Sequence, residues 1–196
     1  MFEPPKGYEK YCEPTFLCES NLPEIKELAQ ALAKDKKTPE EAARAFFYWV
    51  RDNVAWKVEE IVGAKETLKR NPMHGVCADK ANLFIALCRA VGIPARYLLI
   101  FRCQLNAKVK DFPKKVGHVA AEVYLNNEWK VVDPTFGKDT EKLIPLSEFD
   151  RPSWKRIAGV LRVRELSVSL ALFSMLILRF SRSSLKMKEL IESLRK

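Results

Sequence analysis

The chain has 196 residues, of which 47% are hydrophobic and 30% are charged, with only 7 glycines. This length and composition fit one globular domain with a proper core and exclude a low-complexity chain. The net charge of +9 is uneven, because residues 151–196 carry 11 Lys and Arg against 3 Asp and Glu, whereas residues 1–150 carry 23 against 22. We therefore divide the chain into a nearly neutral domain at residues 1–150 and a basic segment at residues 151–196.

The first residues give no targeting signal. The N-terminal sequence MFEPPK lacks the charged and then apolar layout of a signal peptide, which predicts a cytoplasmic protein. The five cysteines are odd in number and their spacings match no zinc pattern, so we expect free thiols in a reducing compartment. Calcium-loop patterns of alternating acidic residues are also absent from the sequence, and we expect no metal and no cofactor.

Two helices are predicted in the first third of the chain. Apolar residues recur at helical spacing over residues 21–34. The next helix is expected at residues 39–53, because Thr38 can cap it and Glu41 completes a capping box. Two shorter elements follow, an extended piece at residues 54–58 and a helical turn at residues 65–70.

The clearest helix begins at Cys77. Its apolar side chains form a broad stripe, which indicates a helix with one large buried face. Gly92 suits the position after the helix end, and Pro94 prevents the helix from continuing. The stripe consists of Ala81, Phe84, Ile85, Leu87, Cys88 and Val91.

An antiparallel sheet is predicted after this helix. Asn126 and Asn127 form a plausible hairpin turn between two strand-like runs. A helix packed on such a sheet is an α+β arrangement. The predicted strands are residues 95–101, 118–125 and 128–132, with a polar, lysine-rich loop over residues 102–116.

The basic segment contains an apolar stretch at residues 166–178 without any charge. It is too short for a membrane-spanning helix, which needs about 20 residues. Residues 166–170 also alternate like a strand, but we expect a helix. Such a helix would pack on the domain, pair with another subunit as a homo-oligomer contact, or lie on an anionic membrane surface. The excess of Lys and Arg in this segment would also suit an acidic partner, although a solvated helix face is an equally good interpretation.

Cys77, His118 and Asp133 supply a thiol, an imidazole and a carboxylate, which are the nucleophile, base and orienting group of covalent acyl transfer. Cys77 stands at a helix start, where free backbone N–H groups favour a thiolate. The alternatives are an inert core thiol, a core histidine and a turn aspartate before proline. The chain has one other histidine, His74, which is the rival base and has no evident orienting carboxylate.

Residues 39–136 resemble the transglutaminase-like superfamily of papain-type fold. The motifs that carry the resemblance are YWVRDNV at 48–54, GVCADKA at 75–81, LFIALCRAVGIPARY at 83–97, Gly117-His118, EVY at 122–124, Trp129 and VDPT at 132–135. The resemblance places the catalytic Cys, His and Asp of the family on Cys77, His118 and Asp133. Ala120 departs from the family pattern, which often has an aromatic residue there, and residues 151–196 match nothing in the family.

The resemblance implies attack of Cys77 on an amide carbonyl of a protein or peptide, giving a thioester. Water as acceptor makes the protein a peptidase or amidase, and a lysine amine makes it a transglutaminase. We expect hydrolysis, because the sequence shows no module that would exclude water or present a second substrate. The Cys77 N–H and the Trp56 indole are candidate oxyanion donors. A non-catalytic binding module that acts through residues 151–196 is the other hypothesis.

Overall fold

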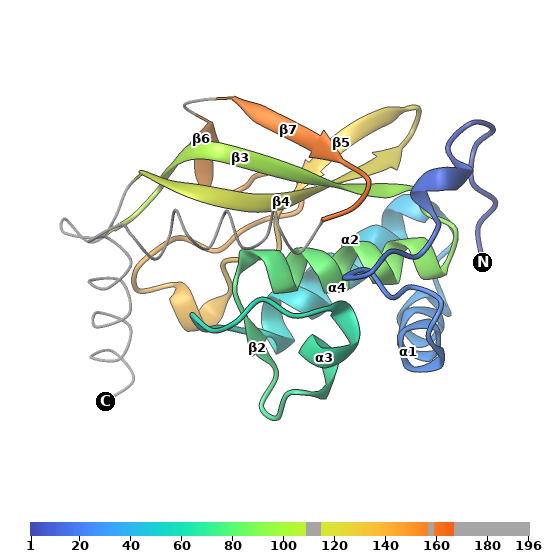
Figure 1. Ribbon diagram of the computed structural model, residues 1–196, viewed down its shortest axis with the longest axis horizontal. Helices are drawn as coiled ribbons and strands as arrows, with labels where there is room; N and C mark the ends of the chain where they lie inside the picture. Colours follow the sequence, from blue (N-terminus) through green and yellow to red (C-terminus); the bar gives the residue numbers. More distant parts are fainter. Residues whose placement is uncertain (109–114, 157–158, 167–196) are drawn as a thin grey trace.

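The computed structural model describes residues 1–108, 115–156 and 159–166. The helices are η1 (Glu9–Tyr11), α1 (Pro23–Ala33), α2 (Pro39–Asn53), α3 (Ala64–Lys69), α4 (Cys77–Ala90) and η2 (Lys138–Thr140). The strands are β1 (Ala55–Trp56), β2 (His74–Gly75), β3 (Ala95–Leu105), β4 (Lys115–Leu125), β5 (Glu128–Val132), β6 (Trp154–Arg156) and β7 (Val160–Val163). Helices lie on one side of an antiparallel sheet, so the predicted α+β class is confirmed (Figure 1).

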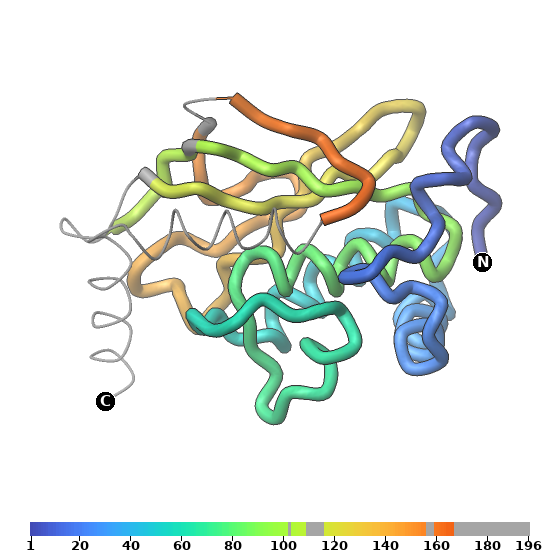
Figure 2. The backbone as a smooth tube through the Cα atoms, in the orientation of Figure 1, coloured from blue at the N-terminus to red at the C-terminus, as the bar shows by residue number. Residues whose placement is uncertain are grey.

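Helix α4 is the central element of the fold. Every residue from Ala78 to Arg89 is buried, because the sheet covers one side of the helix and α1, α2 and α3 cover the others (Figure 1). The helix ends as its sequence predicts. Gly92 has a φ of +86°, a conformation that L side chains rarely adopt. The N-terminal segment lies against this end, where the Phe2 amide donates to the Val91 carbonyl at 2.8 Å (Figure 2).

The helices predicted over residues 21–34, 39–53 and 65–70 are present as α1, α2 and α3. Thr38 Oγ1 caps α2 by accepting the Glu41 N–H at 3.2 Å. The reciprocal half of the predicted capping box is wrong by one residue. The Glu41 carboxylate accepts from the Lys37 amide at 2.7 Å instead of from Thr38.

The main sheet has the strand order β5-β4-β3-β6, and β7 pairs with β3 beside β6. The hairpin between β4 and β5 is confirmed, because Asn126 and Asn127 both have positive φ, 52° and 66°, as a type I′ turn requires. Strand β3 is longer than predicted and continues to Leu105 past an irregularity between Ile100 and Cys103. Its second half, in which polar residues alternate with the buried Cys103 and Leu105, is extended because β4 and β6 pair with its backbone on both sides.

The segment beyond residue 150, which was expected to contain a helix at residues 166–178, begins with two strands that the sequence analysis did not predict. Strand β6 pairs with β3 at Cys103 to Leu105, and β7 pairs with β3 at Tyr97 to Ile100. These strands satisfy the backbone groups along an edge of β3 that would otherwise be unpaired. The helix predicted at 166–178 lies outside the described residues, except for Leu166, which is buried against the helical core.

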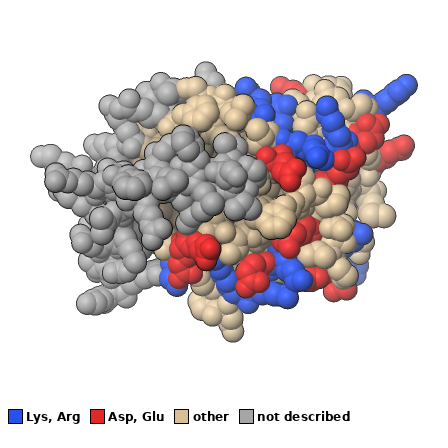
Figure 3. Space-filling view, viewed as in Figure 1, with Lys and Arg blue, Asp and Glu red and all other residues tan. Residues whose placement is uncertain are grey.

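The sheet has a buried cluster on each face. Val119, Ala121 and Val123 of β4 pack with α4, whereas Ala120 belongs to a second cluster with Trp56. Alternate residues of a strand point to opposite faces, so His118 is directed toward the side of Ala120. Charges of both signs are interspersed on the face drawn in Figure 3. Among the described residues, no helix is long and apolar enough to cross a membrane.

Candidate active site

Cys77 is the first residue of α4 and follows a short parallel pairing of β1 with β2. The loop is held by Asp79, two residues further on, whose Oδ2 accepts the Val76 N–H at 2.9 Å. A side chain at Gly75 would place its Cβ 2.5 Å from the Asp79 Cβ, so only glycine allows this approach. The thiol therefore stands, half-buried, at a helix N-terminus whose entry loop is fixed.

Asp79 was not singled out by the sequence analysis, yet it ties two segments to α4. Its carboxylate also accepts the Val62 N–H at 2.8 Å and faces Arg70 at 3.5 Å. Burial raises the pKa of Asp79 to about 6, against the opposing effect of these hydrogen bonds and of Arg70. The signal in the sequence was a carboxylate two residues after Cys77, at the start of a helix whose later part is mainly apolar.

His118 lies on β4, opposite Ile100 of β3, and is almost completely buried. Its Nε2 is 2.8 Å from Asp133 Oδ2, and Cys77 lies close enough for its charge to act on the imidazole. Burial alone lowers the pKa of His118, but the Asp133 carboxylate and the Cys77 thiolate outweigh it and hold the pKa well above its usual value. The imidazolium is thus the favoured form when both partners are ionised.

Asp133 follows β5 and is 1% exposed. Four donors satisfy its two oxygens. Oδ2 accepts from His118 and from the Trp154 indole at 2.6 Å, and Oδ1 accepts from the Thr135 N–H at 3.0 Å and its hydroxyl at 2.5 Å. Burial raises the pKa of Asp133, but His118 and these hydrogen bonds leave it below its usual value. Asp133 therefore stays a buried carboxylate.

The structure thus brings Cys77, His118 and Asp133 together, and it adds aromatic neighbours that the sequence analysis missed. The Phe136 ring lies nearly parallel to the His118 ring, with 5.9 Å between the ring centroids. The Trp154 ring lies edge-on to the His118 ring, with 5.7 Å between the centroids. Trp154 lies in the segment beyond residue 150, outside every recognisable motif, so no sequence signal pointed to it.

Trp56 is the residue suggested as a second oxyanion donor. Trp56 is buried, and in the pairing of β1 with β2 it lies opposite Gly75, which precedes Cys77 by two residues. Its backbone N–H donates to Asp139 Oδ2 at 2.6 Å, which fixes β1 beside the thiol loop. Trp56 is therefore located near the thiol loop, as an oxyanion donor must be. The role of its indole N–H as that donor stays a prediction.

His74, the rival base, is occupied elsewhere. Its Nδ1 faces the Pro72 carbonyl at 2.7 Å, and its Nε2 is 2.6 Å from Glu59 Oε2. The expectation that His74 has no orienting carboxylate is therefore wrong, because Glu59 supplies one from a loop that the sequence pattern did not connect to it. Both nitrogens of this imidazole face partners other than Cys77.

The other cysteines are unpaired and buried or half-buried. Burial raises the pKa of Cys12 and of Cys18 to about 11, and it also raises the pKa of Cys88 and Cys103. Within the ranges that the structure describes, no group of three or more His, Cys, Asp and Glu side chains is arranged to hold a metal ion.

We predict that Trp154→Phe lowers the free energy of unfolding at neutral pH by about 1.5–3 kcal/mol, the range for a hydrogen bond to a charged group. Phenylalanine keeps a ring beside His118 and removes the indole N–H. The pKa of Asp133 is lowered by folding, so the stability from its donors is present above the unfolded value of about 3.9 and is lost as the pH falls through the lower folded value. Urea unfolding at several pH values should show the loss shrinking in acid.

Trp49→Phe is the matched control, because Trp49 is partly buried on α2 and packs against the helical core. The loss of unfolding free energy in Trp49→Phe should not shrink as the pH falls. A loss for Trp154→Phe that is the same at neutral pH and at the acid limit of folding would contradict the predicted bond to the carboxylate.

Comparison with known proteins places the chain in a family. The model of the transglutaminase-like superfamily matches residues 26–134. No match was found among curated proteins. Among solved structures, a candidate cysteine protease from Cytophaga hutchinsonii is similar with a TM-score of 0.54 and 22% identity, over 78% of this chain and 52% of that one.

The periplasmic domain of TgpA from Pseudomonas aeruginosa, bound to ethylmercury, is similar with a TM-score of 0.51 and 19% identity, over 72% of this chain and 51% of that one. The chain therefore spans about half the length of these solved structures. At these identities the likeness shows a shared fold. The family match covers more than half of the 196 residues and includes Cys77, His118 and Asp133, so this chain belongs to the transglutaminase-like superfamily.

Proposed function

We propose that this protein transfers amide acyl groups through a thioester on Cys77, and that the usual acceptor is water. The observation that carries the proposal is the buried hydrogen bond between His118 and Asp133, with the Cys77 thiol near enough for its charge to raise the pKa of the imidazole. A structural cysteine would need neither an imidazole nor a carboxylate in line with it. Family membership supports cysteine-dependent acyl transfer in general.

Each group has a step in the proposed reaction. The Cys77 thiolate attacks the amide carbonyl and forms a C–S bond, while negative charge gathers on the carbonyl oxygen. The C–N bond then breaks, and His118 gives its proton to the leaving amine. In the second half, His118 takes a proton from water as the water attacks the thioester, and the thiolate leaves. Asp133 holds the imidazole in place and favours its charged form.

Exposure of the thiol favours water as the acceptor. Cys77 is half-buried, whereas His118 and Asp133 are 6% and 1% exposed. Cys77 is thus the most exposed of the three groups, and water that reaches its sulfur in the acyl-enzyme can give its proton to the adjacent His118. This arrangement supports a peptidase or amidase that acts on a protein or peptide substrate.

We predict that Cys77 is alkylated by limiting iodoacetamide far faster than the other cysteines at about pH 6. An ordinary thiol with a pKa of about 8.5 is less than about 1% ionised there, whereas a thiolate beside an imidazolium reacts. Burial raises the pKa of Cys12 to about 11, which makes Cys12 an internal reference. Intact-mass measurement with peptide mapping should show that Cys77 is alkylated at least about tenfold faster than the other cysteines, because the thiolate is the reactive form.

His118→Ala is the control for this measurement, and it should remove the advantage of Cys77 at pH 6 without changing the labelling of Cys12. Equal rates for Cys77 and Cys12 in the unmodified protein would refute an activated nucleophile. In that case the acyl-transfer proposal fails.

The acyl acceptor can be tested with a glutamine peptide and a primary amine. Hydrolysis releases ammonia and leaves glutamate, whereas transglutaminase activity incorporates the amine. We predict that ammonia release continues with no amine present. Added amine should convert less than about half of the product into the amine adduct, because a thioester on the half-buried Cys77 is open to water. Exclusive formation of the amine adduct, with none in Cys77→Ala, would establish the transglutaminase alternative.

Trp56 is proposed as a donor to the developing oxyanion. We predict that Trp56→Phe lowers kcat by about 10²–10³, as loss of one such donor does elsewhere. The rate of Cys77 alkylation should stay unchanged, because that reaction builds no oxyanion. A fall in both rates would instead indicate that Trp56 only shapes the thiol loop.

The role of the basic C-terminal segment also stays a proposal, with an acidic partner, a membrane surface or a second copy of the chain as its candidate contacts. Because β6 joins the sheet and Trp154 donates to Asp133, a truncation that tests this must begin after Leu166. We keep the cytoplasm as the proposed location, which the five unpaired cysteines support.

A further inference from the structure

Lys80 is a completely buried lysine, with 0% of its surface exposed. Lysine is almost never fully buried unless it is paired. Among the described residues, no carboxylate lies within ion-pair distance of it, and its Nζ instead donates to two backbone carbonyls. These are the carbonyl of Thr135, at 2.9 Å, and that of Arg51, at 3.3 Å. The ammonium thus joins α4 to two separate segments.

One of these segments carries Asp133. The Thr135 N–H and hydroxyl both donate to Asp133 Oδ1, and Asp133 Oδ2 accepts from His118. Hydrogen bonds therefore run from Lys80 through the Asp133–Thr135 turn to His118. Lys80 follows Cys77 by three residues in the first turn of α4, so the helix that carries the thiol also holds the Asp133–Thr135 turn.

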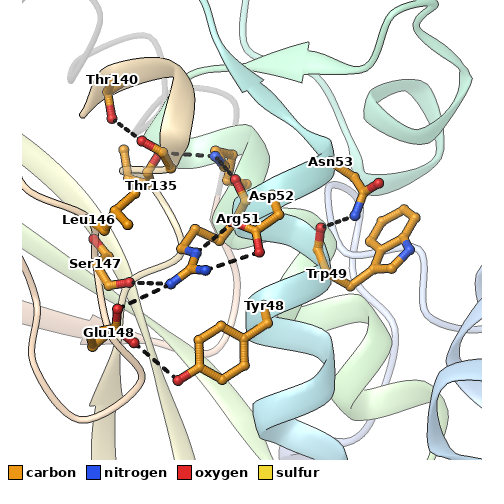
Figure 4. Close-up of polar contacts among 12 residues, drawn as sticks. Tyr48, Trp49, Arg51, Asp52, Asn53, Thr135, Thr140, Leu146, Ser147 and Glu148 are labelled. Atoms are coloured by element: carbon orange, nitrogen blue, oxygen red, sulfur yellow. Dashed lines mark hydrogen bonds and ion pairs between the residues drawn. The ribbon is translucent and has the colours of Figure 1, made fainter. Parts of the chain in front are cut away.

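The other segment is the end of α2, which is itself firmly anchored. The Arg51 guanidinium donates to the Ser147 carbonyl at 3.0 Å and pairs with Asp52 at 2.8 Å (Figure 4). A Cβ at Gly137 would lie 2.4 Å from the Arg51 carbonyl oxygen, so the chain after Thr135 is packed directly on this helix end. Lys80 therefore holds the turn against a fixed support.

Burial of this charge is costly. It lowers the pKa of Lys80 to about 8, while the carboxylates of Asp139, Asp133 and Asp52 act to raise it and Arg51 acts to lower it. An apolar side chain of similar size would avoid the cost of burying an ammonium. Stability alone does not account for a lysine here, whereas a need for donors directed at two carbonyls does.

We propose that Lys80 is a positioning residue for acyl transfer, which sets Asp133 against His118 by holding the Thr135 carbonyl to α4 and to the end of α2. The inference rests on the proposed function and assigns a further residue to the same site. Lys80 touches neither the substrate nor the reacting atoms, so it acts through Asp133.

The test is the titration of the His118 imidazole by NMR in the full chain. The chain has two histidines, so His74 serves as an internal reference. In Lys80→Met the donors are gone and Asp133 is no longer held to Nε2, so the midpoint of His118 should fall by about one pH unit or more. Loss of a nearby positive charge alone would move the midpoint upward. The His74 signal should be unaffected.

Lys80→Gln is the second variant, because it removes the charge but keeps N–H donors. Its His118 midpoint should lie between those of Lys80→Met and the unmodified protein. If Lys80→Met does not fold, the test rests on Lys80→Gln alone. A lowered His118 midpoint in Lys80→Gln then supports the proposal, and an unchanged or raised midpoint overturns it. Circular dichroism and thermal melting establish which variants are folded.

A Lys80→Met protein that is folded and has an unchanged midpoint, with only a lower melting temperature, would mean that Lys80 serves packing alone. A raised midpoint would mean that Lys80 acts only as a charge, and both results overturn the proposal. Failure of the proposed function is seen separately, as slow alkylation of Cys77 in the unmodified protein. The titration then still reports whether Lys80 positions Asp133.

Discussion

The buried carboxylate of Asp133 is the constraint on which the site depends. Removing an ionised carboxylate from water is costly unless hydrogen bonds replace the lost hydration. Here four donors do so, and they come from three parts of the chain: His118 on β4, Trp154 on β6 and the two donors of Thr135 in the adjoining turn. The strands and the turn must be assembled before the carboxylate is satisfied, so the site forms only with the sheet.

Helix α4 contacts this assembly through its first turn. Its first residue carries the thiol, and Asp79 and Lys80 in the same turn fix the loop before it and the turn beyond β5. These two charged side chains are 0% exposed. A helix start that served only packing would bury apolar groups at such positions. The buried polar contacts of α4 instead hold the loop before the thiol and the turn that carries Asp133.

The sequence was sufficient for those parts of the fold that depend on local pattern. The apolar stripe that begins at Cys77, the Asn126-Asn127 hairpin and the glycine after α4 were all predicted correctly, because periodicity and turn chemistry are local. Motif order and spacing indicated Cys77, His118 and Asp133 as one site. The second half of β3 was missed, since its polar residues are extended only because two other strands pair with their backbones.

The residues that the sequence could not supply are those whose role exists only across long chain separations. Trp154 donates to Asp133 from 21 residues away and lies beyond the family match, which ends at residue 134. Its segment is basic, and charge composition separated it from the rest of the chain. The geometry joins it instead to the carboxylate that orients His118. The smallest unit that contains the whole hydrogen-bonded site therefore extends past the family match to β6. A fragment limited to that match would lose both Thr135 donors to Asp133 Oδ1 as well as the Trp154 indole donor to Oδ2.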